Sequence, residues 1–103
     1  MNQPIRIRAR AHAGVAEVTI LMPHPMETGL RLDDSGRRVP AHFITQVSVT
    51  LGERSVFAAQ MSFAVSRDPL LSFRFAGAAS GQRLRVAWTD NLGEVRIDEA
   101  TIA

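Results

Sequence analysis

The chain has 103 residues, of which 46% are hydrophobic and 21% charged, and its formal net charge is +2. This length and composition fit one folded domain spanning residues 1–103 and exclude a disordered chain. All twelve basic residues are arginine, so the high sequence pI of about 11.0 reflects the type of base and not a large positive charge. We therefore expect no nucleic-acid partner.

Several classes of chemistry are excluded by the absence of cysteine. The chain can form no disulfide, thiolate nucleophile or cysteine-ligated metal centre. Its first residues alternate apolar residues with arginine and lack the apolar core of a secretory signal, and no window is long and apolar enough for a membrane span. Taken alone, these features indicate a chain that stays in the cytoplasm and has no membrane partner.

Apolar and polar residues alternate along most of the chain, which is typical of half-buried β-strands. The first strand is expected over residues 5–11, with arginines on its polar face, and the second over residues 15–22. A third is expected over residues 39–51, with Phe43 inward and Ile44 outward. The turn at Gly52 leads to a fourth strand over residues 55–65, which ends before Pro69.

The last third of the chain contains three more short alternating runs, over residues 71–76, 84–88 and from residue 95 onward. About seven strands at this spacing predict an all-β, immunoglobulin-like antiparallel β-sandwich, although a small barrel would show the same local pattern. The five phenylalanines and Trp88 are expected in the core, with Trp88 at its centre and Phe43 also a possible partner anchor.

Four motifs along the chain resemble, in order and spacing, those of the SoxZ family. They are HPMETG (residues 24–29), PAHFI (40–44), SRDPLLSF (66–73) and VAWTDNLG (86–93). The resemblance covers essentially the whole chain. It implies an immunoglobulin-like subunit that is not an enzyme, has no cofactor, and forms a heterodimer with SoxY, which carries the covalently bound sulfur intermediates of thiosulfate oxidation.

The same resemblance implies transient docking of this sulfur carrier to the other Sox enzymes. It also changes the expected compartment, because SoxZ proteins work in the periplasm and are thought to be exported together with SoxY, which bears the signal peptide. A missing signal peptide in this chain would then mean that the heterodimer forms before export.

The three histidines, His12, His24 and His42, are separated by 12 and 18 residues, which matches no local metal-ligand spacing. We therefore predict no metal site and expect His24 and His42 to cap loops by hydrogen bonding. The nearby acids Glu27 and Asp33 lie in a polar segment and are expected to be solvated or to form turns. A small metal- or redox-active β-domain acting directly on a sulfur species remains the alternative function, and a homodimeric adhesion-type module is a third.

The candidate partner interface lies in two proline-containing segments whose composition neither core filling nor turn formation requires. Its residues are His24, Pro25, Met26, Glu27, Pro40, His42, Phe43 and Ile44. Proline sets the backbone in advance and lowers the cost of ordering a loop on binding. The stripe of Arg6, Arg8 and Arg10 is expected to be a solvated face, or a docking site for an acidic partner or the anionic sulfur cargo.

Overall fold

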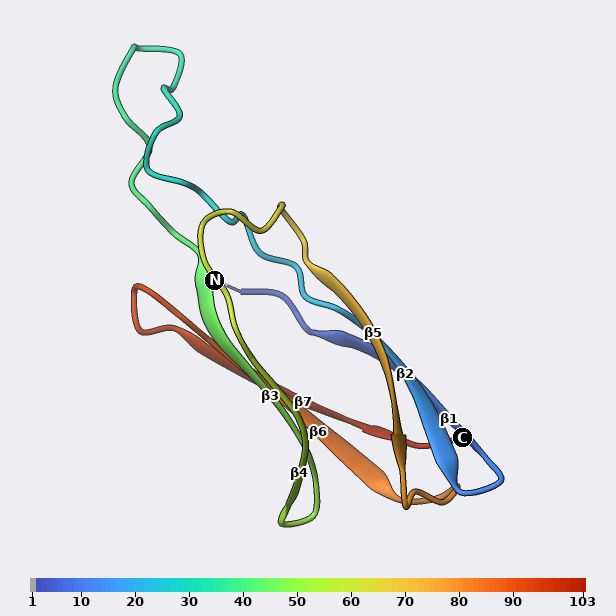
Figure 1. The fold of residues 1–103 in the computed structure, drawn as a ribbon. Coiled ribbons are helices and arrows are strands. Elements are labelled where there is room, and N and C mark those ends of the chain that lie inside the picture. Colours follow the sequence, from blue (N-terminus) through green and yellow to red (C-terminus); the bar gives the residue numbers. More distant parts are fainter. Residues whose placement is uncertain (1) are drawn as a thin grey trace.

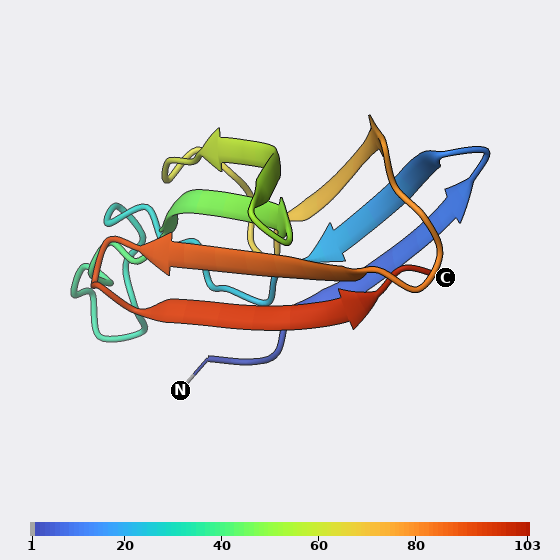
Figure 2. The ribbon, with the colours of Figure 1, turned by 90° about the horizontal axis from the view of Figure 1, so that it is seen from below.

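The protein is a two-layered antiparallel β-sandwich, in agreement with the predicted all-β, immunoglobulin-like class (Figures 1 and 2). The computed structural model describes residues 2–103. Its strands are β1 (Arg6–His12), β2 (Val15–Leu21), β3 (Ile44–Leu51), β4 (Arg54–Gln60), β5 (Leu70–Ala76), β6 (Arg83–Asp90) and β7 (Val95–Thr101). One sheet has the order β1-β2-β5 and the other the order β4-β3-β6-β7. These described residues form no helix, and so no helix that could cross a membrane.

Tight turns between paired strands set the register of each sheet. Ala13 and Gly14 connect β1 to β2 with φ values of 52° and 80°, the positive values that a two-residue hairpin needs to match the strand twist. Gly52, with a φ of 60°, performs the same role between β3 and β4. The predicted hairpin at Gly52 is therefore confirmed.

The hydrophobic core lies between the two sheets and is built around Trp88, which is fully buried as predicted. The prediction that all six aromatic residues fill the core holds in part, because Phe43, Phe57 and Phe73 pack against the core without being fully buried and Phe63 lies outside it. Only Phe75 joins Trp88 as a buried aromatic, whereas Phe63 is 49% exposed and Phe43, Phe57 and Phe73 are half-buried. Phe57 and Phe73 remain partly exposed because they lie at the edge strands β4 and β5.

Two predicted strands are longer than the strands observed. β3 begins at Ile44 and not at residue 39, and an irregularity between Ile44 and Gln46 turns the Ile44 side chain fully into the core, opposite to its predicted face. β4 ends at Gln60 and not at residue 65. Residues 61–69 leave their sheet there because they cross to the other layer, where β5 begins (Figure 1).

A long arm, residues 27–42, projects from one end of the sandwich (Figure 1). Its two ends are paired by backbone hydrogen bonds between Glu27 and His42, and Leu32 forms a second bridge with Arg38. Near the tip, Asp33 accepts hydrogen bonds from the backbone of Ser35 and Arg37, so this acid forms a turn as predicted. The arm contributes to the molecule's elongated dimensions of 54 × 20 × 19 Å.

The two long sides of the sandwich differ. On the side between β1 and β7, which we call the closed side, Ala11 N donates to Ala103 O and Ala103 N to Ala9 O, each over 2.9 Å. Ile5 N also donates to Asp98 Oδ2 over 2.8 Å. On the side between β4 and β5, the open side, no backbone hydrogen bond within residues 2–103 joins the two strands.

Candidate functional site

The base of the arm contains a cluster of two histidines around one acid. His24 lies just before the arm, His42 ends it, and Asp90 is the last residue of β6. His24 Nε2 lies 3.0 Å and His42 Nε2 2.8 Å from the same Asp90 oxygen, Oδ2. The Asp90 side chain has no exposed surface and that of His42 is 24% exposed. The fold therefore joins side chains that are far apart in sequence.

Asp90 accepts four hydrogen bonds, which fill both of its carboxylate oxygens. Oδ2 accepts from the two histidines, and Oδ1 accepts from Leu92 N at 3.0 Å and Glu94 N at 2.9 Å. Burial by itself raises the pKa of Asp90, but the hydrogen bonds from His24, His42, Glu94 and Leu92 outweigh it and leave the pKa below its ordinary value. Asp90 is thus held as a carboxylate.

The second ring nitrogen of His24 decides what this cluster can do. His24 Nδ1 accepts a hydrogen bond from Met26 N over 3.1 Å, so its lone pair faces a backbone N–H. The ring proton must then sit on Nε2, where it is donated to Asp90. A metal ion at Nε2 requires the opposite arrangement, with the proton on Nδ1 facing an acceptor. The ligand atoms of His24, His42 and Asp90 lie within 4.8 Å of one another, yet their hydrogen bonds suit a structural role.

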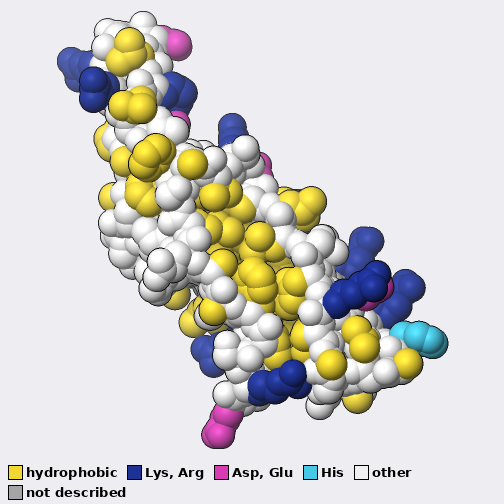
Figure 3. All heavy atoms as spheres, in the orientation of Figure 1, with side chains coloured by type: hydrophobic (Ala, Val, Ile, Leu, Met, Phe, Trp, Pro, Cys, Tyr) yellow, Lys and Arg dark blue, Asp and Glu magenta, His cyan; other side chains and the backbone are white. Residues whose placement is uncertain are grey.

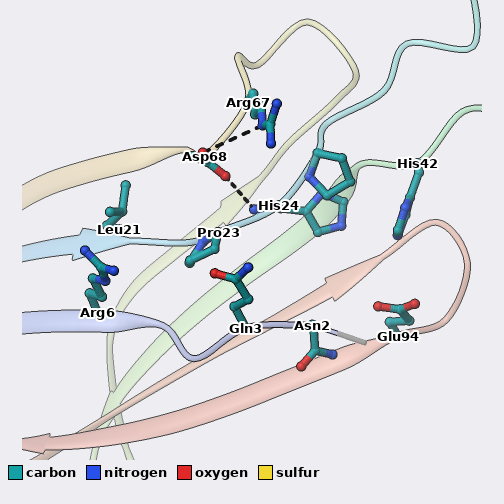
Figure 4. A pocket seen from close by; sticks show the side chains of 11 residues that line it. Asn2, Gln3, Arg6, Leu21, Pro23, His24, His42, Arg67, Asp68 and Glu94 are labelled. Carbon is teal, nitrogen blue, oxygen red and sulfur yellow. Dashed lines mark hydrogen bonds and ion pairs between the residues drawn. The ribbon is translucent and has the colours of Figure 1, made fainter. Parts of the chain in front are cut away.

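An open pocket of about 430 Å³ lies beside this cluster (Figure 4). Its lining includes both histidines together with two cations, Arg6 and Arg67, and two acids, Asp68 and Glu94. Asp68 Oδ1 accepts a hydrogen bond from His24 N over 2.9 Å, which joins the crossover between β4 and β5 to the segment before the arm. The two arginines and two acids give this lining no net formal charge when the histidines are neutral.

The predicted interface residues divide into a buried and an accessible group. His24, Met26 and Ile44 are buried, and Ile44 N donates to Met26 Sδ over 3.3 Å. The accessible group consists of Pro25, Glu27, Pro40, His42 and Phe43. The buried residues brace the base of the arm, and only the second group offers surface to a partner; its part in an interface stays a prediction.

Glu27 forms an ion pair with Arg31 on the arm. A side-chain hydrogen bond from Arg31 lowers the pKa of Glu27, so this carboxyl group is ionised at neutral pH. A general acid would need the opposite shift. The absence of acid–base chemistry in this segment stays a prediction.

Arg6, Arg8 and Arg10 are exposed on the outer face of β1, as the alternation predicted. None of them forms an ion pair with another residue in the described part of the chain. Arg6 also borders the pocket beside His24 (Figure 4). The stripe is free to contact a docking partner.

Sequence reasoning missed the role of Asp90, which was placed only in a turn. The turn itself is present, because Gly93 N donates to Asp90 O, but the side chain also points to two histidines 66 and 48 residues away. The available signal was local: Asp90 ends a strand whose alternate residues, Leu84, Val86 and Trp88, are all buried. An acid continuing that inward face needs partners, and the histidines are the natural donors.

Comparison with known proteins gives one family and one fold. The family model described as sulphur oxidation protein SoxZ matches residues 5–101. No curated protein gives a significant sequence match.

Among solved structures, the fold is similar to a reduced variant of the superoxide reductase neelaredoxin from Archaeoglobus fulgidus (TM-score 0.68, 21% identity, covering 100% of this chain and 91% of that one). It is also similar to an oxidised superoxide reductase (TM-score 0.67, 13% identity, 99% and 89% covered). A third similar structure is a hypothetical protein of Pyrococcus horikoshii (TM-score 0.67, 15% identity, 99% and 89% covered). At these identities the likeness concerns the fold alone.

Proposed function

The chain belongs to the SoxZ family of sulphur oxidation proteins, and on that premise we propose that it is the non-catalytic subunit of the SoxYZ sulfur carrier. In this role it forms a heterodimer with SoxY, which holds the sulfur intermediates of thiosulfate oxidation, and it helps the carrier dock to the other Sox enzymes. The family match over residues 5–101 is the observation on which the proposal rests.

The side-chain chemistry of the chain supports a non-catalytic role. Without cysteine the chain has no thiolate on which sulfur intermediates can be held covalently. The histidine and acid cluster at the base of the arm has both Asp90 oxygens and both His24 nitrogens engaged in internal hydrogen bonds. A nucleophile or general base needs a free lone pair directed at a substrate.

Docking of the carrier to its enzymes is assigned to the arginine stripe of β1 and to the accessible residues at the base of the arm. Guanidinium groups match the oxygens of carboxylates and of sulfonate-like groups with paired hydrogen bonds. Arg6, Arg8 and Arg10 are exposed and point from the same face of one strand. Neutralising all three should lower carrier turnover and its salt dependence, whereas unchanged kinetics with each Sox enzyme would remove the stripe from the docking site.

The proposed compartment is the periplasm, reached by export with SoxY. Fractionation of cells that express this chain with and without SoxY tests it. The chain should enter the periplasm only when SoxY is present with its own signal peptide. Export of this chain alone would show that it travels independently.

Co-expression with SoxY, followed by purification through a tag on SoxY and intact-mass measurement, tests the function directly. The expected result is a one-to-one heterodimer in which thiosulfate-derived mass increments appear on SoxY only. SoxY with its carrier cysteine replaced by serine is the matched control, because the heterodimer should form without any increment. Purification of SoxY without this chain, or increments on this chain, would contradict the proposal.

A metal- or redox-active domain is the second candidate, favoured by the ligand atoms of His24, His42 and Asp90 lying within 4.8 Å. The Met26 hydrogen bond to His24 Nδ1 opposes it, since it fixes the proton on the nitrogen that a metal would need. Titration of the purified heterodimer with Zn²⁺ and Fe²⁺ should show no stoichiometric binding. One equivalent of metal, lost in a His42→Ala variant, would establish the second function.

A further inference from the structure

The open side of the sandwich lacks one strand. β1 and β7 are edge strands of the two sheets and lie next to each other on the closed side, so the strands of each sheet can be counted from there. From that side one sheet continues for four strands to β4, but the other continues for only three and ends at β5. The strand orders therefore leave β4 without a counterpart in the other sheet among residues 2–103.

Apolar side chains are half-exposed in the space where that strand would lie. Figure 3 shows a hydrophobic band running along this side of the molecule. We call it the apolar strip and define it by the partly buried hydrophobic residues of β4, β5 and the crossover between them: Val56, Phe57, Met61, Val65, Leu71 and Phe73. The rings of Phe57 and Phe73 stack across the gap, with centroids 4.6 Å apart and an interplanar angle of 16°.

The free edge of β5 offers an unused row of backbone groups. Met22 N donates to Pro69 O, and in an antiparallel ladder hydrogen-bonded pairs recur at every second residue. Leu71 and Phe73 therefore bond to β2, and the N–H and C=O groups of Leu70, Ser72 and Arg74 point away from it. By the same rule, Met61 N donating to Thr45 O leaves Ala58 and Gln60 facing the free edge of β4.

Arg54 shows that the free edge of β5 accepts hydrogen bonds from across the gap. Its Nη2 donates to Ala76 O over 2.8 Å, and its Nη1 to Gly77 O over 3.3 Å. The guanidinium thereby closes one end of the open side, and the crossover of residues 61–69 closes the other. Between them lies a length of β5 whose edge groups face outward.

We propose that the open side binds one extended segment of the SoxY partner, which pairs with β5 as a fourth strand and covers the apolar strip with alternate apolar side chains. This inference rests on the proposed function. Only an extended backbone can supply donors and acceptors in a row to Leu70, Ser72 and Arg74, and alternate side chains of such a segment point to one face.

The closed side shows how this fold completes a sandwich edge. There the segment of Ile102 and Ala103 pairs with the free edge of β1 through both backbone groups of Ala103, while the Ile102 side chain is buried in the core. One extended segment thus satisfies the edge and fills the core at the same time. The open side has the same two requirements and no segment in residues 2–103 that meets them.

A second copy of this chain fits the open side poorly. The strip needs a strand whose inward side chains are not engaged elsewhere. In a second copy joined through β5, the inward residues Leu71, Phe73 and Phe75 already pack on their own core. The segment from SoxY must accordingly lie outside the packed core of SoxY itself.

Amide hydrogen exchange in the wild-type heterodimer tests the inference. The Ser72 and Arg74 amides should exchange at least about 100-fold more slowly than the Ala58 and Gln60 amides, which lie on the free edge of β4 in the same molecule. Equal rates at the two edges in an intact heterodimer would overturn the inference and leave the proposed function standing. Failure of the two chains to associate would overturn both. Equal protection of the Ser72 and Arg74 amides in this chain without SoxY would overturn the inference alone, because no partner strand would then be needed to protect them.

A pair of proline variants gives an independent measurement. Ser72→Pro removes one outward-facing N–H of β5 and leaves the β2 ladder intact, so SoxY affinity should fall by roughly 10-fold or more. Ala58→Pro makes the matched change on β4 and should alter the affinity by less than about twofold. Equal losses in both variants, with unfolding midpoints like that of the wild type, would contradict pairing at β5. The exchange experiment decides the question if Ser72→Pro does not fold.

Discussion

The two long sides of this sandwich each consist of one edge strand from each sheet, but they are joined by different contacts. The β1 and β7 side is joined by backbone hydrogen bonds to Ala103 and by the bond from Ile5 N to Asp98. In residues 2–103, the β4 and β5 side is joined by the stacked rings of Phe57 and Phe73, by Arg54 and by the crossover of residues 61–69, without a backbone hydrogen bond between the two strands. We expect the closed side to contribute mainly to the stability of the chain and the open side mainly to partner binding. Substitutions on one side at a time can measure this difference.

The largest expected loss of stability comes from the closed side. Ile102→Ala removes a side chain that is only 1% exposed, and should lower the free energy of unfolding by roughly 2–5 kcal/mol. Denaturant unfolding monitored by Trp88 fluorescence measures it. Ile97→Ala, on the exposed outer face of β7, is the control and should cost less than about 1 kcal/mol. Equal costs would mean that the closed side is not part of the stabilising core.

A smaller loss is expected on the open side. Phe57→Ala should cost about 1–2 kcal/mol in the isolated chain, because the ring, which stacks on Phe73 and packs against the core, is only half-buried. Its effect on SoxY affinity should exceed its effect on unfolding, since a partner strand would bury what solvent now reaches. Calorimetric titration and denaturant unfolding of the same variant give both numbers. If Phe57 only stabilises the chain, the loss of unfolding free energy should instead exceed the loss of binding free energy.

The closed side should also respond to acid. A hydrogen bond from Arg96 lowers the pKa of Asp98, aided by the bond from Ile5 N. A lowered folded-state pKa gives stability that is full above the ordinary carboxyl value of 3.8 and is lost as the pH falls below it. Asp98→Asn should cost about 1 kcal/mol at pH 7 and nothing further in acid. Thermal unfolding between pH 2 and pH 7, roughly the range over which carboxyl groups titrate, compares the two proteins; identical pH profiles would show that Asp98 is not the titrating group.

The smallest effect is expected from Arg54, the polar bridge of the open side. Arg54→Ala removes two exposed hydrogen bonds, to Ala76 O at the end of β5 and to Gly77 O just after it, and should change the unfolding free energy by less than about 0.5 kcal/mol. Arg74→Ala, which breaks an exposed pair with Glu17, is the control of equal charge. A loss several times larger than in the control would show that the open side is held by its cation and not by its rings.

Local pattern predicted the strands well because each strand presents one face to the core. The alternation around Trp88 and the hairpin at Gly52 follow from backbone geometry that neighbouring residues determine. The same alternation misled where tertiary position decides: residues 39–43 alternate like a strand but form the return of the arm. Alternation predicted that Phe57 and Phe73 lie in the core, because it shows which face of a strand a side chain occupies but not whether a second strand covers that face.

The candidate site was predicted only in part for a related reason. His24 and His42 were identified from their proline-containing segments, but the acid that joins them lies 66 and 48 residues further along the chain. Periodicity places side chains on faces and gives no distance between segments so far apart. The open side likewise depends on the number of strands in each sheet, which alternation does not determine.

The hydrogen bonds of Asp90 have a mechanical consequence for the arm. His24 immediately precedes the arm and His42 ends it, and both are held by the same carboxylate oxygen. One buried carboxylate therefore ties both ends of the arm to the end of β6, and the arm beyond it carries the exposed side chains of Leu30 and Leu32, 67% and 58% exposed. Asn91, the next residue, binds Ala41 O and Phe43 N, so the direction in which the arm leaves the sandwich is fixed by two neighbouring residues at the end of β6.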